Sequence, residues 1–119
     1  MTLDDAIAIY AERTLDRVER AALCHAIAAD TAHALDALAL TVAQRYMNGS
    51  LTFEIADAVM NDLFAHGCEL SEIPSLMYSI YEAFDDGEYV HREDPPGTDS
   101  EVKYTRPQLA RVLEHAGAI

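Results

Sequence analysis

The apolar residues of this 119-residue chain recur at spacings of three and four, and no stretch alternates apolar with polar residues as a strand would. The clearest example contains Leu76, Met77, Ile80, Tyr81 and Phe84. Side chains at this spacing lie on one face of an α-helix and favour burial of that face. Because no internal repeat is present either, the sequence predicts an all-α fold, arranged as a single-domain antiparallel bundle.

Glycine, proline and capping residues divide this pattern into about five helices. The expected ranges of the first three helices are 3–29, 31–47 and 53–66. The fourth helix is expected to begin between residues 71 and 74 and to end at 86, and the fifth spans 107–115. Thr2 and Asp5 match a capping box, and Thr52 is expected to cap the third helix. Asp30 and Thr31 fit the start of the second helix, but one unbroken helix through this point fits the same residues.

The two halves of the chain differ in composition. Residues 1–48 contain 13 alanines, which favour helix and let neighbouring helices approach closely. We therefore expect a packed antiparallel helical pair there, with Asp16 and Arg20 paired on its outer face, and a homodimer through these residues is possible. Residues 51–119 are expected to form an acidic helical half, with one long loop at 87–104 before the last helix.

Cysteine usage and hydropathy indicate where in the cell the protein is located. Cys24 and Cys68 fall in separate parts of the pattern and give no disulfide framework of the kind found in small secreted domains. No basic start is followed by a continuous apolar run, and no window reaches the roughly 18 apolar residues needed to span a bilayer. We therefore expect a cytoplasmic protein that does not contact membrane.

Negative charge is concentrated in the second half of the chain. The formal net charge is −13, with 7 acids and 4 bases in residues 1–48 but 14 acids and 4 bases in residues 49–119. Such a field repels nucleic acid and anionic membranes and attracts basic surfaces. Direct nucleic-acid binding is therefore disfavoured, and a basic protein is the expected partner.

The segment 82–101 carries eight carboxylates and a single cation, Arg92. Gly87 is expected to end the preceding helix, because glycine tolerates the left-handed backbone of many helix ends. A loop this long and this acidic either keeps the protein dissolved or docks on a cationic partner. On the second interpretation, the partner-binding residues are Asp85, Asp86, Glu88, Tyr89, Glu93, Asp94, Asp99 and Glu101, with Tyr89 as the aromatic anchor.

Catalytic and metal signatures are weak in comparison. The stretches Cys24-His25 and His66-Gly67-Cys68 match no zinc spacing, and a calcium loop centred on Gly87 would need an oxygen ligand where Phe84 stands. Cys68 near His66 is the only local nucleophile and base, so a small hydrolase is the less favoured alternative. We expect a protein without enzymatic activity, metal or cofactor.

The order of features over about residues 46–115 resembles the colicin D immunity family of small acidic helical proteins. The resemblance rests on Tyr46-Met47-Asn48-Gly49-Ser50-Leu51-Thr52-Phe53-Glu54, on a helix ending in Phe84-Asp85 before an acidic loop, and on a last helix with Leu109, Val112 and Leu113. It implies a bacterial immunity protein, a stoichiometric inhibitor whose carboxylates imitate nucleic-acid phosphates in the basic groove of a nuclease toxin. The alternative is a helical homo-oligomer with no toxin partner.

Overall fold

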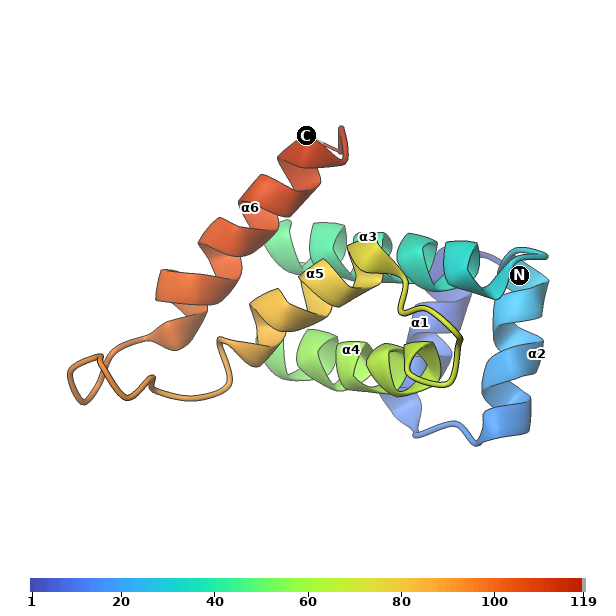
Figure 1. Ribbon diagram of the computed structural model, residues 1–119, viewed down its shortest axis with the longest axis horizontal. Coiled ribbons are helices and arrows are strands. Elements are labelled where there is room, and N and C mark those ends of the chain that lie inside the picture. The colour runs from blue at the N-terminus through green and yellow to red at the C-terminus, as the bar shows by residue number, and fades with distance from the viewer. Residues whose placement is uncertain (119) are drawn as a thin grey trace.

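The computed structural model describes residues 1–118 and confirms the all-α prediction over that range. The described residues form six α-helices, and a π-helical turn, Glu101–Thr105, leads directly into the last of them (Figure 1). The helices are α1 (Leu3–Glu12), α2 (Arg17–Ile27), α3 (Thr31–Met47), α4 (Phe53–Gly67), α5 (Ser75–Asp85) and α6 (Arg106–His115).

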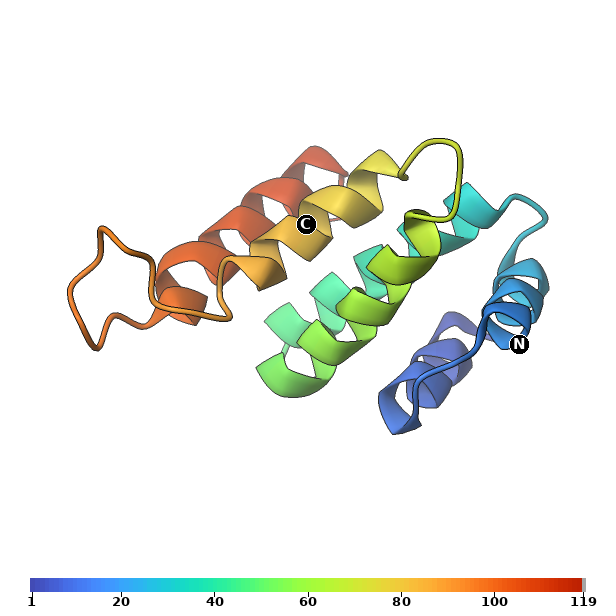
Figure 2. The same cartoon turned by 60° about the horizontal axis from the view of Figure 1, so that its bottom comes forward.

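Helix α3 is the centre of the fold and packs against α1, α2, α4, α5 and α6. Helices α3, α4 and α5 lie side by side, α1 and α2 cover one end of this layer, and α6 crosses near α5 (Figures 1 and 2). The axes of α2 and α3 meet at 83°, so these two helices cross nearly at right angles and do not run antiparallel. The fully buried side chains include Ile7, Leu35, Leu38, Met60, Leu63, Met77, Ile80, Phe84, Leu109 and Leu113.

The first expected helix, 3–29, is wrong, because the chain breaks between Glu12 and Arg17. Asp16 begins α2 instead of continuing α1: its carboxylate accepts a hydrogen bond from the Glu19 amide at 2.8 Å, and the Glu19 side chain accepts one from the Asp16 amide at 3.2 Å. The expected pairing of Asp16 with Arg20 is also wrong, since Arg20 pairs with Glu69 at 2.9 Å. This break is the reason for six helices where five were expected.

The other helix boundaries follow the capping residues closely. Thr2 caps α1 in a complete capping box, and Thr52 caps α4 through its hydroxyl, as predicted. Asp30 caps α3, which settles the second helix as a separate element beginning at Thr31. Helix α5 has no cap of its own, and the amide of Met77 in its first turn donates to Asp36 of α3 at 2.9 Å.

Gly87 has a different role from the one expected. Its backbone is not left-handed, although the φ of Gly49 is, at +86°, as the predicted stop after α3 requires. A Cβ atom on Gly87 would lie 2.0 Å from the hydroxyl oxygen of Thr105, which donates to the Ala83 carbonyl at 2.7 Å. Gly87 is therefore needed because the π-helical turn approaches the end of α5 so closely.

The expected loop at 87–104 is shorter in the structure, because residues 101–105 belong to the π-helical turn. Over residues 1–118 no single helix is long and apolar enough to cross a membrane. Helices α2 and α3 reach that length and composition only when they are joined across the 83° bend.

Candidate functional site

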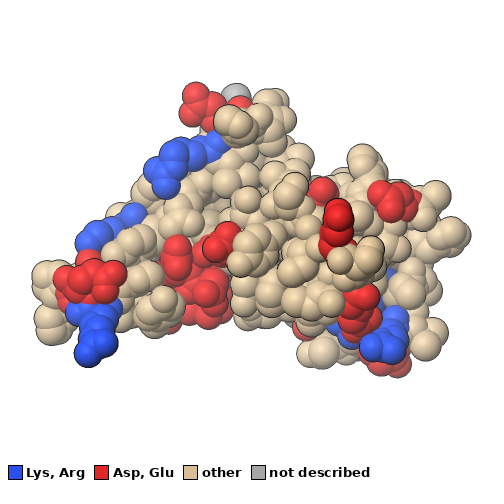
Figure 3. Space-filling model, in the orientation of Figure 1, with Lys and Arg blue, Asp and Glu red and all other residues tan. Residues whose placement is uncertain are grey.

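On the face of the molecule shown in Figure 3, acidic side chains gather where α5 ends beside the start of α4. Asp85 is the last residue of α5, Glu88 follows three positions later, and Asp57 is in the second turn of α4. The Glu88 carboxylate also accepts a hydrogen bond from the Asn61 side chain at 3.5 Å. Asp57, Asp85 and Glu88 are called the acidic cluster below.

The carboxyl groups of the acidic cluster lie close together and partly buried, so their negative charges repel one another. Partial burial, a hydrogen bond with Glu88 and the negative charges of Glu88 and Asp85 raise the pKa of Asp57 to about 8. The pKa of Asp85 is also raised, chiefly by partial burial and by the charge of Glu88. Asp57 therefore retains a proton near neutral pH, and an approaching cation favours the loss of that proton.

Three aromatic rings lie beside the acidic cluster on the same face of α4 and α5. Phe64 and Tyr81 stack with their ring centroids 3.8 Å apart and an interplanar angle of 8°, and Tyr78 lies 6.0 Å from Phe64. Tyr78 is 40% exposed. Tyr81 lies four positions before Asp85 on α5, so its ring and the carboxylate are on the same face one turn apart. Partial burial and then the charges of Asp85, Glu88 and Asp57 raise the pKa of Tyr81.

These six residues form one mixed surface, called the α4–α5 surface: Asp57, Phe64, Tyr78, Tyr81, Asp85 and Glu88. A ring face attracts a cation through its quadrupole, and a nearby carboxylate adds a charge-assisted hydrogen bond. Guanidinium groups satisfy both demands because they are planar and carry several donors. The chemistry of this surface therefore suits basic side chains, arginine in particular.

Two of the predicted binding residues stabilise the attachment of the last helix. The Asp86 carboxylate accepts a hydrogen bond from the Gln108 side chain at 2.9 Å. Glu101 accepts one from the Tyr46 hydroxyl, and the Arg106 guanidinium lies 5.5 Å from the centre of the Tyr46 ring. Both carboxylates are only partly exposed and already have partners within the chain.

Two more of the predicted residues hold the connector 86–100 against the π-helical turn. Asp94 forms an ion pair with Lys103 and accepts a hydrogen bond from the Tyr104 hydroxyl at 2.6 Å, and its side chain is only 4% exposed. These contacts lower the pKa of Asp94, with the Lys103 hydrogen bond as the largest cause. Asp99 accepts a hydrogen bond from the Val102 amide at 3.2 Å and so stabilises the start of the turn.

Tyr89 and Glu93 remain open to solvent. The Tyr89 side chain is 53% exposed and stacks on His91 at 4.4 Å, and His91 in turn lies 4.1 Å from the Tyr104 ring. Glu93 is exposed. Of the eight predicted residues, the structure thus brings Asp85 and Glu88 together and places the others at separate points along the connector and the π-helical turn.

The sequence did not single out Asp57 or Phe64, although one signal for Asp57 was available. Helices α4 and α5 are consecutive and joined by a short connection, and such helices usually pack antiparallel. The start of α4 then lies beside the end of α5, so a carboxylate near position 57 falls close to Asp85. No local pattern distinguishes Phe64 from an ordinary core residue.

A second polar group that the sequence did not indicate lies buried among α1, α2 and α4. Cys24 Sγ lies 3.6 Å from His66 Nδ1. Cys68, which the sequence suggested as a nucleophile beside His66, is exposed. Burial raises the pKa of the Cys24 thiol and lowers the pKa of His66, so both groups are neutral near pH 7. The Tyr10 hydroxyl and Arg20 Nε are buried without hydrogen-bond partners. A buried neutral thiol is a poor nucleophile.

Across the described part of the chain, no three His, Cys, Asp or Glu side chains are placed so that they could hold a metal ion. No family model, curated protein or solved structure is significantly similar to this chain.

Proposed function

We propose that this protein is a non-enzymatic binding protein that neutralises a basic, nuclease-type toxin in the manner of the immunity family it resembles. The α4–α5 surface is the principal contact, with exposed residues of the connector such as Tyr89 and Glu93 at its edge. In this role the carboxylates occupy the positions that nucleic-acid phosphates take in the toxin's basic groove.

One observation carries the proposal: the carboxylates of the acidic cluster adjoin an aromatic group that is partly exposed. Carboxylates alone also serve solubility, but stacked rings at the surface lose contact with water only when a partner covers them. Complementary potentials accelerate the encounter of two proteins, and buried aromatic side chains slow their separation. An inhibitor that must intercept a toxin quickly and retain it needs both properties.

The test is inhibition of ribonuclease activity by the purified protein. Its first step is a search for an adjacent reading frame that encodes a basic C-terminal domain, and that domain is the nuclease for the assay. The variant Asp85→Lys/Glu88→Lys reverses two charges of the acidic cluster, and we expect it to weaken inhibition by about a hundredfold or more. The matched control, Glu12→Lys/Glu72→Lys, changes the net charge equally at two exposed positions elsewhere and should inhibit normally.

Full nuclease activity in the presence of excess wild-type protein would contradict the proposal. Equally weakened inhibition by the two charge variants would show that net charge, and not the α4–α5 surface, is responsible. Normal inhibition by both variants would exclude the acidic cluster from the contact. Asp94 and Asp99 are unsuitable for such a test, because their internal hydrogen bonds make loss of local structure an alternative explanation.

The alternative function, a homo-oligomeric helical protein, is favoured by one exposed apolar side chain in the alanine-rich half. Val18 on α2 is 77% exposed, whereas Leu35 and Leu38 are fully buried in the protein's own core. A subunit contact through residues 1–48 would therefore use Val18. Light scattering at high salt, repeated on Val18→Glu, would detect a dimer that depends on this residue.

A further inference from the structure

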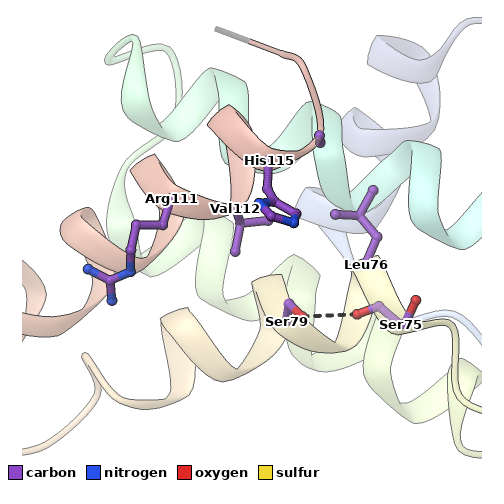
Figure 4. Close-up of a pocket in the computed structure, with 7 residues that line it drawn as sticks. Ser75, Leu76, Ser79, Arg111, Val112 and His115 are labelled. Carbon is purple, nitrogen blue, oxygen red and sulfur yellow. Dashed lines mark hydrogen bonds between the residues drawn. The ribbon is translucent and has the colours of Figure 1, made fainter.

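A continuous groove runs between α5 and α6. Its first part is a hollow of about 580 Å³ lined by Ser75, Leu76 and Ser79 of α5 and by Arg111, Val112, His115 and Ala116. Figure 4 shows Leu76 facing Val112 and His115 across this hollow, while Arg111 points away from Leu76. Most of the surface of this part is apolar, although Arg111 and His115 also line it.

The second part of the groove has the opposite chemistry. It is a hollow of about 300 Å³ that shares Ser79, Arg111 and Val112 with the first and adds Glu82, Asp86 and Gln108. The two carboxylates lie in the last turn of α5 or directly after it, where the partial negative charge of the helix end also favours a cation. The groove is thus mainly apolar at one end, and at the other end the carboxylates of Glu82 and Asp86 outnumber the one cation, Arg111.

The helix geometry sets the distance between the two ends. Leu76 and Glu82 are six residues apart on α5, which at the rise of an α-helix is about 9 Å. Two side chains that lie seven positions apart on a helix point to the same side and are separated by about 10 Å. A helical ligand with an apolar residue and a basic residue at this spacing matches both ends of the groove at once.

We propose that the α5–α6 groove binds an amphipathic helix of the basic partner, with an apolar side chain between Leu76 and Val112 and a lysine or arginine at Glu82 and Asp86. The inference rests on the proposed function, because the partner is the same basic protein. The different chemistry of the two ends of the groove sets the direction of the bound helix. Amphipathic helices commonly bind grooves of this kind through residues one and two turns apart.

The probe is a synthetic helical peptide of about 15 residues with capped ends, which carries leucine and arginine seven positions apart on an alanine and glutamine background. Three matched peptides replace the leucine by glutamine, replace the arginine by glutamate, or reduce the spacing to five positions. Binding to the full chain is followed by nuclear magnetic resonance, from the shifts of the α5 and α6 amide signals. We expect the parent peptide to bind about tenfold more tightly than each matched peptide.

Two variants test whether the binding takes place in the groove. Ser79 is exposed and lines both hollows, so Ser79→Arg fills the groove and should weaken parent-peptide binding about tenfold. Glu82→Lys, at another exposed position, should weaken it to a similar extent without filling the groove. Ala8→Arg, on the exposed side of α1, is the control for added charge and should bind as wild type does.

Equal affinity for the parent peptide and the glutamate peptide would overturn the inference. Wild-type affinity in both Ser79→Arg and Glu82→Lys would also overturn it. Failure of this inference is distinct from failure of the proposed function. If these two variants inhibit the nuclease normally and Asp85→Lys/Glu88→Lys does not, the groove is dispensable and the proposed function stands. If the peptide binds as expected and no nuclease is inhibited, the proposed function fails and the groove site stands.

Discussion

Within the acidic cluster, folding changes the pKa of Asp57 the most. Its pKa rises from the ordinary value of 3.8 to about 8, so the folded protein holds a proton that the unfolded chain has already released at neutral pH. The stabilising contribution of this proton is complete below about pH 4 and is lost as the pH rises through 8. An asparagine at this position has the same shape and no charge to lose.

We therefore expect Asp57→Asn to flatten the dependence of stability on pH. Between pH 7 and pH 9, wild-type protein should lose more free energy of unfolding than the variant, by about 1 kcal/mol after allowance for solvent screening. Urea unfolding followed by circular dichroism at both pH values measures this difference. The control Glu93→Gln, at an exposed site on the connector, should follow the wild-type curve. Parallel curves for wild type and Asp57→Asn would contradict the assignment.

At the same scale, the sequence could predict part of the candidate site. Asp85 and Glu88 were named because a run of carboxylates is visible in the sequence itself. The internal partner of Glu101 was not visible, because Tyr46 lies 55 positions from the carboxylate to which it donates. The Cys24 and His66 contact spans 42 positions and was likewise invisible. A sequence shows where charge is concentrated but not which charges the fold uses for its own bonds.

Helix α5 carries more of the proposed binding residues than any other helix, and it depends on another helix for its start. Pro74 precedes it and gives no side-chain cap, and the Met77 amide instead donates to Asp36 on α3. Where a cap was local, as at Thr52 and Thr2, the sequence predicted the helix start correctly. Asp16 and Glu19 also have the spacing of a capping box, but this pattern lay within a continuous helical period and the break was missed.

Asp36→Ala should lower the free energy of unfolding by about 1 to 2 kcal/mol, because it leaves a partly buried amide of the first turn without an acceptor. Hydrogen exchange followed by mass spectrometry should show the largest loss of protection at the start of α5. Glu72→Ala, an exposed residue just before that helix, is the control and should change stability by no more than about 0.5 kcal/mol. Unchanged exchange in α5 of Asp36→Ala would contradict this assignment.

Over the whole molecule, negative charge is concentrated in one half of the chain, whereas the exposed aromatic rings act only at the point of contact. We therefore expect charge to govern the association rate constant and the rings to govern the dissociation rate constant. The second half of the chain carries 14 of the 21 acidic residues, and the exposed ring of Tyr78 belongs to the α4–α5 surface. Long-range attraction acts before contact, whereas a covered ring must be uncovered before the partner leaves.

With the basic nuclease domain as partner, we expect the association rate to fall about tenfold or more when salt is raised from low to physiological concentration. Tyr78→Ala should instead raise the dissociation rate about tenfold with little change in association. Surface plasmon resonance gives both constants. Tyr89→Ala tests the connector in the same way and separates its contribution from that of the α4–α5 surface. An association rate independent of salt would contradict the electrostatic part of the proposal.

The Asp36 contact to the first turn of α5 has a consequence for any attempt to reproduce binding with a fragment. The acceptor lies 41 residues earlier in the chain, so a short peptide copied from residues 75–88 lacks the group that fixes its beginning. Such a peptide would also be near the length at which isolated helices are marginal in water. The proposed recognition therefore requires the folded chain, and a miniature inhibitor designed on that proposal would have to retain α3 or replace Asp36 with an engineered cap.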